Sequence, residues 1–265
     1  MVFMKIPVFS LEGTKKTEIS AAKAFKEPVR TDLIKRAVLA EQSEKRQAYG
    51  TDPMAGKRTS AHYHGRRGIK HSMMNREMAR MKRIHGSGHL HMRARFVPQA
   101  TKGRKAHPPI AEKVWTKKIN VKEWEKALNS AITATADDKL VKERGHLIEG
   151  VKHVPIVIED KIQDVEKSKD ILKTLTKLGL EKELERTKET KTRAGRGKTR
   201  NRKKIVRKGP LLVTSKAGMA SKAGANILGF DVVPLNLLTV EDLAPGTVPG
   251  RLCIWTQSAL AQLEK

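Results

Sequence analysis

The sequence has little of what several classes of protein need. Its one cysteine, Cys253, excludes an internal disulfide and a zinc site built from several cysteines. Aromatic residues make up only 4% of the chain, and no stretch approaches 18 consecutive apolar residues, which excludes a membrane-spanning helix. The N-terminus also lacks the basic-then-apolar pattern of an export signal. We therefore expect a soluble intracellular protein with no membrane partner.

Acidic residues are nearly missing from two segments. The chain has 55 Lys and Arg against 28 Asp and Glu, for a formal net charge of +27. Residues 45–107 hold 16 bases and two acids, and residues 186–208 hold 12 bases and one acid. These segments carry 25 of the 27 net charges, so the rest of the chain is almost neutral. Such a charge run can be a solvated face or a disordered tail, but self-repulsion inside each segment favours a polyanionic partner.

Apolar periodicity outside these segments predicts alternating strands and helices. Strands are expected at 2–9 (at a sheet edge, because of Pro7), 154–158, 211–214, 231–234 and 252–255. Helices are expected at 29–48, 121–136 (with Asn120 as N-cap), 168–178 (ended by Gly179), 180–189, 216–228, 240–243 and 258–263. This alternation predicts an α/β fold, a parallel-sheet globular domain with helices on both faces.

Residues 45–107 have no sustained apolar period, and seven glycines interrupt them. A helix is expected only at 73–83, where methionines recur at helical spacing. A loop this long is either functional or disordered alone, and fully extended it spans about 200 Å. The expected organisation is a discontinuous body (1–44 and 108–265) interrupted by an extended loop (45–107), with a basic loop (186–208) inside the body.

Histidines gather in the same segment, which holds seven of the nine. The pairs His62/His64 and His89/His91 lack the i, i+4 spacing of a helical zinc motif, and the segment has no cysteine and only two acids. No metal is therefore expected, and the imidazoles are expected to stack on bases or bind phosphates.

No arrangement typical of an enzyme stands out. Gly197-Lys198-Thr199 resembles the end of a phosphate-binding loop, but Thr192 stands where that motif needs glycine and no buried strand precedes it. No nucleophile–base or paired-carboxylate pattern is evident either. We expect no catalysis, no cofactor and no small-molecule substrate.

The cysteine and the tryptophans are expected to be structural. Cys253 lies in an apolar run and is expected to be a buried, inert thiol. Trp124 and Trp255 fall on apolar patterns and are expected in the core. Trp115 lies among lysines, and the choice between core and exposed stacking platform stays open.

Several stretches together resemble one known family. They read RTDLIKRAVLAEQSEKRQAYGTDPMAGKRTSA (30–61), FVPQATKGRKAHPP (96–109), TRAGRGKTRNRKK (192–204) leading into RKGPLLV (207–213), and FDVVPLNLLTVEDLAPGTVPGRLCIWTQSAL (230–260). In this order they resemble the universal large-subunit ribosomal protein L-four family, in the branch shared by archaea and eukaryotes. The short glycine run HGSGH (85–89) is most similar to the archaeal version.

The resemblance implies a structural constituent of the large subunit of the cytoplasmic ribosome, which binds and stabilises large-subunit ribosomal RNA (rRNA) during assembly. It implies that the loop at 45–107 threads through folded rRNA and, with a second ribosomal protein, narrows the nascent-peptide exit tunnel. Large-subunit rRNA, that second tunnel-constriction protein and other large-subunit proteins are the expected partners. The expected tunnel-lining residues are Arg66, Arg67, Gly68, Ile69, Lys70 and His71.

The basic side chains of both segments are expected to contact mostly RNA backbone, with little base readout. The alternatives are an off-ribosome regulatory RNA-binding protein that represses its own message, and a nucleotide-driven RNA remodeller suggested by Gly197–Thr199 alone. The expected RNA-binding residues are Lys57, Arg58, Arg66, Arg67, Lys70, Arg76, Arg80, Lys82, Arg83, Arg93, Arg95, Lys102, Arg104, Lys105, His107, Arg193, Arg196, Lys198, Arg200, Arg202, Lys203 and Lys204.

Overall fold

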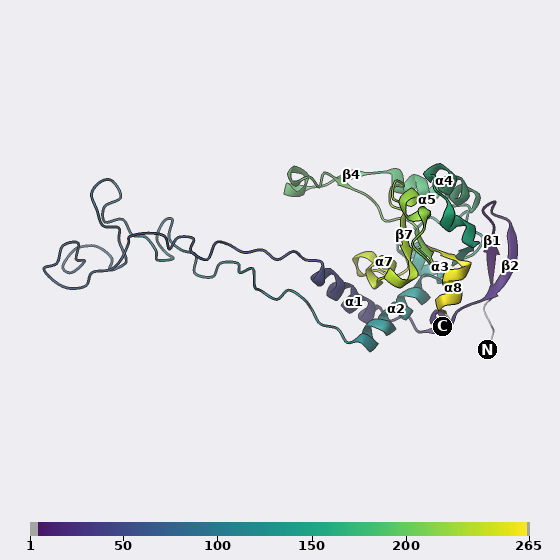
Figure 1. Ribbon diagram of the computed structural model, residues 1–265, viewed down its shortest axis with the longest axis horizontal. Helices are drawn as coiled ribbons and strands as arrows, with labels where there is room; N and C mark the ends of the chain where they lie inside the picture. Colours follow the sequence, from purple (N-terminus) through teal and green to yellow (C-terminus); the bar gives the residue numbers. More distant parts are fainter. Residues whose placement is uncertain (1–4, 264–265) are drawn as a thin grey trace. The chain divides into compact units, whose positions relative to one another are not determined.

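The computed structural model describes residues 5–263, and the chain divides into two compact units (Figure 1). The body unit consists of Met1–Lys45 and Thr116–Lys265, and the loop unit consists of Arg46–Trp115. Residues 2–4 of the strand expected at 2–9 lie outside the described residues. In the chain, the loop unit is one continuous insertion between the two parts of the body unit.

A six-stranded sheet, in the order β2-β1-β3-β8-β6-β7, forms the centre of the body unit. β1 and β2 are antiparallel, and the other neighbouring pairs are parallel. Parallel neighbours need long crossover connections, and the helices of the body unit lie in these connections. The strands of this sheet are β1 (Lys5–Phe9), β2 (Lys15–Ser20), β3 (Ile156–Ile158), β6 (Leu211–Thr214), β7 (Asp231–Pro234) and β8 (Cys253–Thr256).

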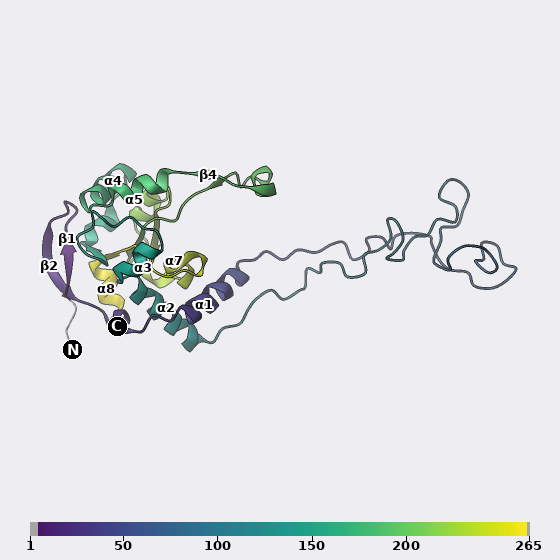
Figure 2. The ribbon, with the colours of Figure 1, turned by 180° about the vertical axis from the view of Figure 1, so that it is seen from behind.

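Helices cover both faces of the sheet, which Figures 1 and 2 show from opposite sides. Successive strand residues point to opposite faces: Val213 and Trp255 join one buried apolar cluster, whereas Leu212 and Ile254 join the other. Residues of α1, α2, α7 and α8 complete the first cluster, and residues of α3, α4, α5 and α6 complete the second. The α/β fold with helices on both faces is thus confirmed. The α-helices are α1 (Thr31–Glu44), α2 (Val121–Ala134), α3 (Asp138–Glu143), α4 (Ser168–Lys177), α5 (Glu181–Lys188), α6 (Met219–Gly224), α7 (Val240–Leu243) and α8 (Gln257–Leu263).

Short 3₁₀ helices and a small hairpin complete the body unit. β4 (Lys191–Thr192) and β5 (Lys204–Ile205) pair antiparallel and form a narrow arm that extends from the body unit (Figures 1 and 2). Among residues 5–263, no helix is long and apolar enough to cross a membrane. The 3₁₀ helices are η1 (Lys23–Lys26), η2 (Asp160–Asp164), η3 (Gly195–Arg200), η4 (Leu235–Leu237) and η5 (Pro245–Thr247).

The expectation of an edge strand at the N-terminus is wrong. β2, which the sequence analysis did not predict, takes the edge position, and β1 lies between β2 and β3. Pro7 is tolerated inside the sheet because β3 pairs only with Val8 and Phe9. At Pro7, β1 therefore has a single neighbouring strand, and the missing N–H of proline breaks no second ladder.

Two helix ends were predicted with different success. Gly179 follows α4 with φ of +85°, and a Cβ there would lie 2.0 Å from the carbonyl oxygen of Gly150, so the predicted glycine stop is confirmed. Asn120 stands at the N-cap of α2, but its side chain makes no capping hydrogen bond. The predicted N-cap position is thus confirmed without the side-chain cap, and Glu123, three residues later, accepts a hydrogen bond from Arg36 of α1 at 3.1 Å.

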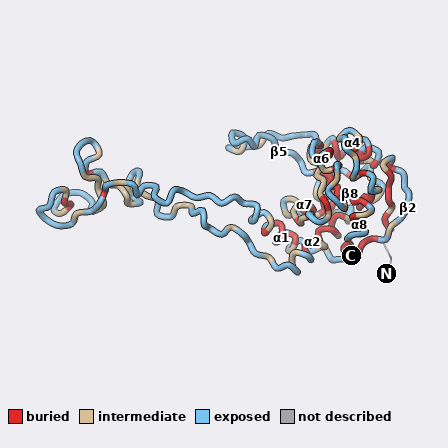
Figure 3. Tube along the Cα trace, viewed as in Figure 1, coloured by how far each residue is buried: buried red, intermediate tan, exposed pale blue. Residues whose placement is uncertain are grey.

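The loop unit contains no helix and no extended strand, so the helix expected at 73–83 is wrong. Asn75 has φ of +55°, and Arg83 exchanges backbone hydrogen bonds with His62, which takes this end of the segment into an antiparallel bridge. The methionine spacing had no apolar surface to bury against, and Met78 stays 38% exposed. Figure 3 shows the same contrast, with burial concentrated in the body unit and exposure along most of the loop unit.

Candidate nucleic-acid interface

Backbone hydrogen bonds bring distant segments of the loop unit together. The outgoing and returning parts meet where the Thr51 N–H donates to the Pro109 carbonyl at 3.1 Å. Further along, Arg83 forms antiparallel bridges with His62 on one side and Ala94 on the other. Three short segments, around residues 62, 83 and 94, therefore lie side by side.

None of the expected RNA-binding side chains is buried. Most are exposed, and Lys82, Arg83, Arg95, Arg104 and Arg193 are half-buried. Of the whole set, only Arg58 has a carboxylate partner in the described part of the chain, namely Asp52. The remaining charges are not neutralised by a carboxylate in that part of the chain.

Four half-buried members of the set instead support the fold of their own segments. Arg83 donates to the carbonyls of Met92 and Ala79, each at 2.9 Å. Lys82 lies 4.1 Å from the centroid of the Phe96 ring.

Two further members of the set are held by backbone carbonyls. Arg95 donates to the Thr101 carbonyl at 3.1 Å, and Arg193 donates to the Arg202 carbonyl at 2.9 Å. A guanidinium held in this way still has N–H groups available for a phosphate.

The expected tunnel-lining residues form a tight exposed turn. Arg66, Arg67, Ile69 and Lys70 are exposed, and Gly68 has φ of +77°. The Ser72 N–H donates to the Ile69 carbonyl at 3.0 Å, which closes the turn. His71 is half-buried, because its ring stacks on His85 at a centroid distance of 4.8 Å.

An aromatic and cationic stack, which the sequence analysis did not assemble, lies near the two ends of the loop unit. Trp115 stacks on Tyr49 with ring centroids 5.7 Å apart and planes inclined by 21°. Arg46 and Lys113 lie over the Trp115 ring at 3.8 and 4.4 Å. Of the two interpretations left open for Trp115, the apolar core is therefore wrong. No local pattern could have revealed the stack, because Tyr49 and Trp115 are 66 residues apart.

The second basic segment begins and ends at a buried ion-pair network. Glu183 of α5 is fully buried and accepts hydrogen bonds from His146 and Arg186, both at 2.7 Å. The Leu147 N–H donates to its other oxygen at 3.0 Å, and Arg186 also donates to the Lys208 carbonyl at 2.8 Å. The network thereby joins the two ends of residues 186–208.

Burial alone would raise the pKa of Glu183, but the hydrogen bonds from Arg186 and His146 outweigh it and hold that pKa at about 2. Burial lowers the pKa of His146, although the neighbouring carboxylate opposes this effect. Glu183 is therefore a carboxylate and His146 a neutral imidazole at neutral pH.

Gly197-Lys198-Thr199 lies in η3, at the tip of the β4–β5 arm. The element before it is a two-residue exposed strand, not the buried strand that a phosphate-binding loop follows. The geometry therefore does not support nucleotide binding through this motif.

Cys253 is fully buried in β8, and burial raises the pKa of its thiol to about 12. The expectation of an inert thiol is confirmed. Trp255 is fully buried, and Trp124 packs against the same cluster while its Nε1 donates to Glu41 at 2.7 Å. Both tryptophans thus belong to the core, as predicted.

These observations define a class of protein: an α/β body that carries two cationic segments in which most Lys and Arg side chains have no carboxylate partner among the described residues, which is the form of a polyanion-binding protein. A family model described as "Ribosomal protein L4/L1 family" matches residues 19–265. The chain therefore belongs to this family, and the resemblance found in the sequence is confirmed.

Curated relatives match along nearly the whole chain. The Large ribosomal subunit protein uL4 of Nanoarchaeum equitans is 46% identical, over 99% of this chain and 98% of the relative. The proteins of the same name from Methanoculleus marisnigri and Methanopyrus kandleri are 45% and 42% identical, over 99% of this chain and 99% and 98% of the relatives. These relatives are archaeal, in agreement with the branch suggested by HGSGH (85–89).

Proposed function

We propose that this protein is a structural component of the large subunit of the cytoplasmic ribosome and that its two basic segments bind large-subunit rRNA. One observation carries the proposal: of the basic side chains assigned to RNA contact, none is buried and only Arg58 is paired with a carboxylate. The relatives named as large-subunit proteins support the structural role over the message-repressing alternative. The proposed role involves no catalysis.

Phosphate contacts explain how the two segments act. Unpaired Lys and Arg side chains on an RNA backbone release condensed counterions, and this release drives binding. Contacts of this kind position the protein without reading sequence. Tyr49, which stacks on Trp115 and is 52% exposed, adds a ring on which an unpaired base can stack.

The proposed role of the loop unit is more specific than RNA binding alone. Residues 45–107 enter folded rRNA, and the exposed turn at Arg66–His71 lines the exit tunnel together with a second ribosomal protein. The backbone bridges around residues 62, 83 and 94 support this role, since they join the segments while few side chains, and no Lys or Arg side chain, become buried.

Salt dependence of rRNA binding tests the proposal. The triple variant Arg66→Gln, Arg67→Gln, Lys70→Gln removes three unpaired charges. If all three contact phosphates, the slope of log K against log salt falls by about 2. The matched control Lys15→Gln, Lys173→Gln, Lys182→Gln removes three charges that carboxylates already neutralise. An equal fall in the control would show that only net charge matters and would contradict the assigned contacts.

Subunit assembly provides the second test. A chain without residues 62–95 should keep a folded body unit, because none of the buried clusters of that unit uses them. Large subunits carrying this chain should be depleted in sucrose gradients or should elongate abnormally. Normal particles with normal elongation would contradict the role of the loop unit.

A further inference from the structure

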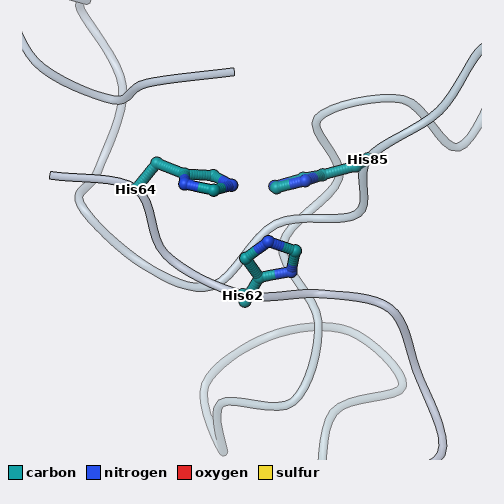
Figure 4. A group of neighbouring side chains, drawn as sticks. All are labelled: His62, His64 and His85. Atoms are coloured by element: carbon teal, nitrogen blue, oxygen red, sulfur yellow. The ribbon is translucent and has the colours of Figure 1, made fainter. Parts of the chain in front are cut away.

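Three histidines of the loop unit gather into one group, although they come from two distant parts of the sequence. His62 and His64 lie on one segment, and His85 lies on another (Figure 4). One ring nitrogen from each lies within 4.8 Å of the others. The ring centroids are 4.0 Å apart for His62 and His85, 4.5 Å for His62 and His64, and 4.6 Å for His64 and His85.

The backbone holds all three residues in place. His62 and Arg83 exchange backbone hydrogen bonds at 3.2 and 3.3 Å, and the His64 carbonyl accepts from the Met73 N–H at 3.1 Å. Immediately before His85, Ile84 donates to the Arg93 carbonyl and accepts from the Met92 N–H, at 2.9 and 3.0 Å. These backbone hydrogen bonds bring the two segments together in the fold.

The hydrogen bond of His62 leaves its metal-binding nitrogen available. Its Nδ1 lies 2.9 Å from the Ser60 carbonyl oxygen, and because a carbonyl only accepts, Nδ1 carries the proton. The lone pair of the neutral ring is then on Nε2. A backbone carbonyl on the other nitrogen is the usual second partner of a metal-binding histidine.

We propose that His62, His64 and His85 form a binding site for Zn²⁺ that fastens the segment at 62–64 to the segment at 85. Imidazole suits a divalent ion of this borderline-soft class, and three protein ligands leave a fourth position for water. With Zn–N bonds of about 2.0–2.1 Å, tetrahedral ligand nitrogens lie about 3.3 Å apart. Rotation of the three rings about their side-chain bonds closes the difference from the present separation.

The sequence analysis expected no metal because it had only the close pairs His62/His64 and His89/His91. The third ligand is 21 residues from His64 and reaches the pair through the bridge at Arg83. The loop unit supplies no carboxylate to the site, and its cationic side chains oppose a divalent ion. Binding by the free protein should therefore strengthen as salt screens these charges.

Direct Zn²⁺ titration of the full-length protein, made without a polyhistidine tag, tests the site. A competing chromophoric chelator should report one saturable Zn²⁺ per chain. His62→Ala, His64→Ala and His85→Ala should each weaken this binding at least tenfold. The matched control is His89→Ala, at an exposed histidine of the same loop unit that lies outside the group of three, and it should bind as the wild type does.

Trypsin cleavage gives a second readout that does not depend on RNA. Zn²⁺ should slow cleavage after Arg66, Arg67 and Lys70 in the wild type and in His89→Ala, but not in His85→Ala. Absence of stoichiometric binding, or equal loss in His89→Ala, would overturn the proposal. Since Trp255 is buried in the body unit, its near-UV signal shows whether each variant retains a folded body.

Discussion

The body unit and the loop unit are parts of one chain, yet they differ in how many apolar side chains they bury and in how many of their charges they pair. The body unit buries two large apolar clusters and pairs many of its charges. Residues 46–115, all of which are described, bury only Ala61, Ser72, Met73 and Met92 and contain one carboxylate ion pair, Arg58–Asp52. Ordering a backbone costs about 1–2 kcal/mol per residue, which burial must offset. The body unit is equipped to fold alone, whereas the loop unit needs a partner to supply what its sequence lacks.

The β4–β5 arm shows an intermediate solution. Between residues 190 and 206, none of its bases has a carboxylate partner among the described residues, and the loop unit comes close to this with a single pair. Its ends, however, are joined through Glu183, Arg186 and the Lys208 carbonyl. A cationic segment can therefore be anchored by a single buried network while its tip remains free for RNA.

Proteolysis of the RNA-free protein should show the largest difference between the units. Trypsin should cut the loop unit about a thousandfold faster than the sheet and helices of the body unit, because cleavage there requires global opening against several kcal/mol. Mass spectrometry of early digestion products should place the first cuts within residues 46–115 and within the exposed β4–β5 arm. A resistant fragment that contains residues 45–107 would contradict the comparison.

Core truncation should separate the two units next. Leu175→Ala removes a fully buried side chain of α4 and should lower the free energy of unfolding of the body by about 2–5 kcal/mol. Met73→Ala removes a side chain that is equally hidden, at 2% exposure, but in the loop unit. It should leave the unfolding of the body unchanged in urea titrations followed by tryptophan fluorescence. A loss from Met73→Ala as large as that from Leu175→Ala would show that the units fold as one.

Acid should lower the free energy of unfolding of the body unit through the Glu183 network at the base of the β4–β5 arm. The pKa of Glu183 is about 2 in the folded state against an ordinary 4.5, so its contribution is complete above pH 4.5 and is lost as the pH falls toward 2. Glu183→Gln should cost about 3 kcal/mol at pH 7, because it leaves Arg186 without its partner. It should also flatten the fall of stability between pH 4.5 and 2.

The matched control for this prediction is Glu149→Gln. Glu149 pairs with Lys182 at 2.6 Å, but both side chains are exposed, so the expected change in stability is below about 1 kcal/mol. Equal pH profiles for Glu183→Gln and the wild type would contradict the role assigned to the network.

The difference between the units also explains how much could be predicted from the sequence. In the body unit, the predicted ends of β6, β7 and α7 match the observed ends. Each of these elements is a short apolar run bounded by polar residues, so local burial determines where it begins and ends. β2 was missed because KKTEIS is almost entirely exposed and shows no apolar alternation. It is a strand only because the backbone of β1 pairs with it.

In the loop unit, the chemistry of the segments was predictable from the sequence but their arrangement was not. The charge pattern alone identified the Lys and Arg side chains, none of which is buried in the loop unit. The bridge at Arg83, the stack of Tyr49 on Trp115 and the approach of His85 to His62 all join residues far apart in sequence. No local period encodes such contacts, and the methionine spacing at 73–83 even favoured a helix that is absent.

The smallest expected effect concerns the single ion pair of the loop unit. In the fold, Asp52 accepts hydrogen bonds from Arg58, which lower the pKa of the carboxyl group and occupy the guanidinium. Asp52→Asn should release Arg58 for a phosphate and raise rRNA affinity about twofold, in keeping with an exposed pair worth about 0.5 kcal/mol. Glu77→Gln makes the same change of charge at an exposed acid with no ion-pair partner in the described chain, so it is the matched control. If filter binding shows a gain for Asp52→Asn alone, the pair restrains Arg58. Equal gains for the two variants would show that rRNA affinity responds only to the net charge of the loop unit. That result would contradict a specific effect of the Arg58–Asp52 pair.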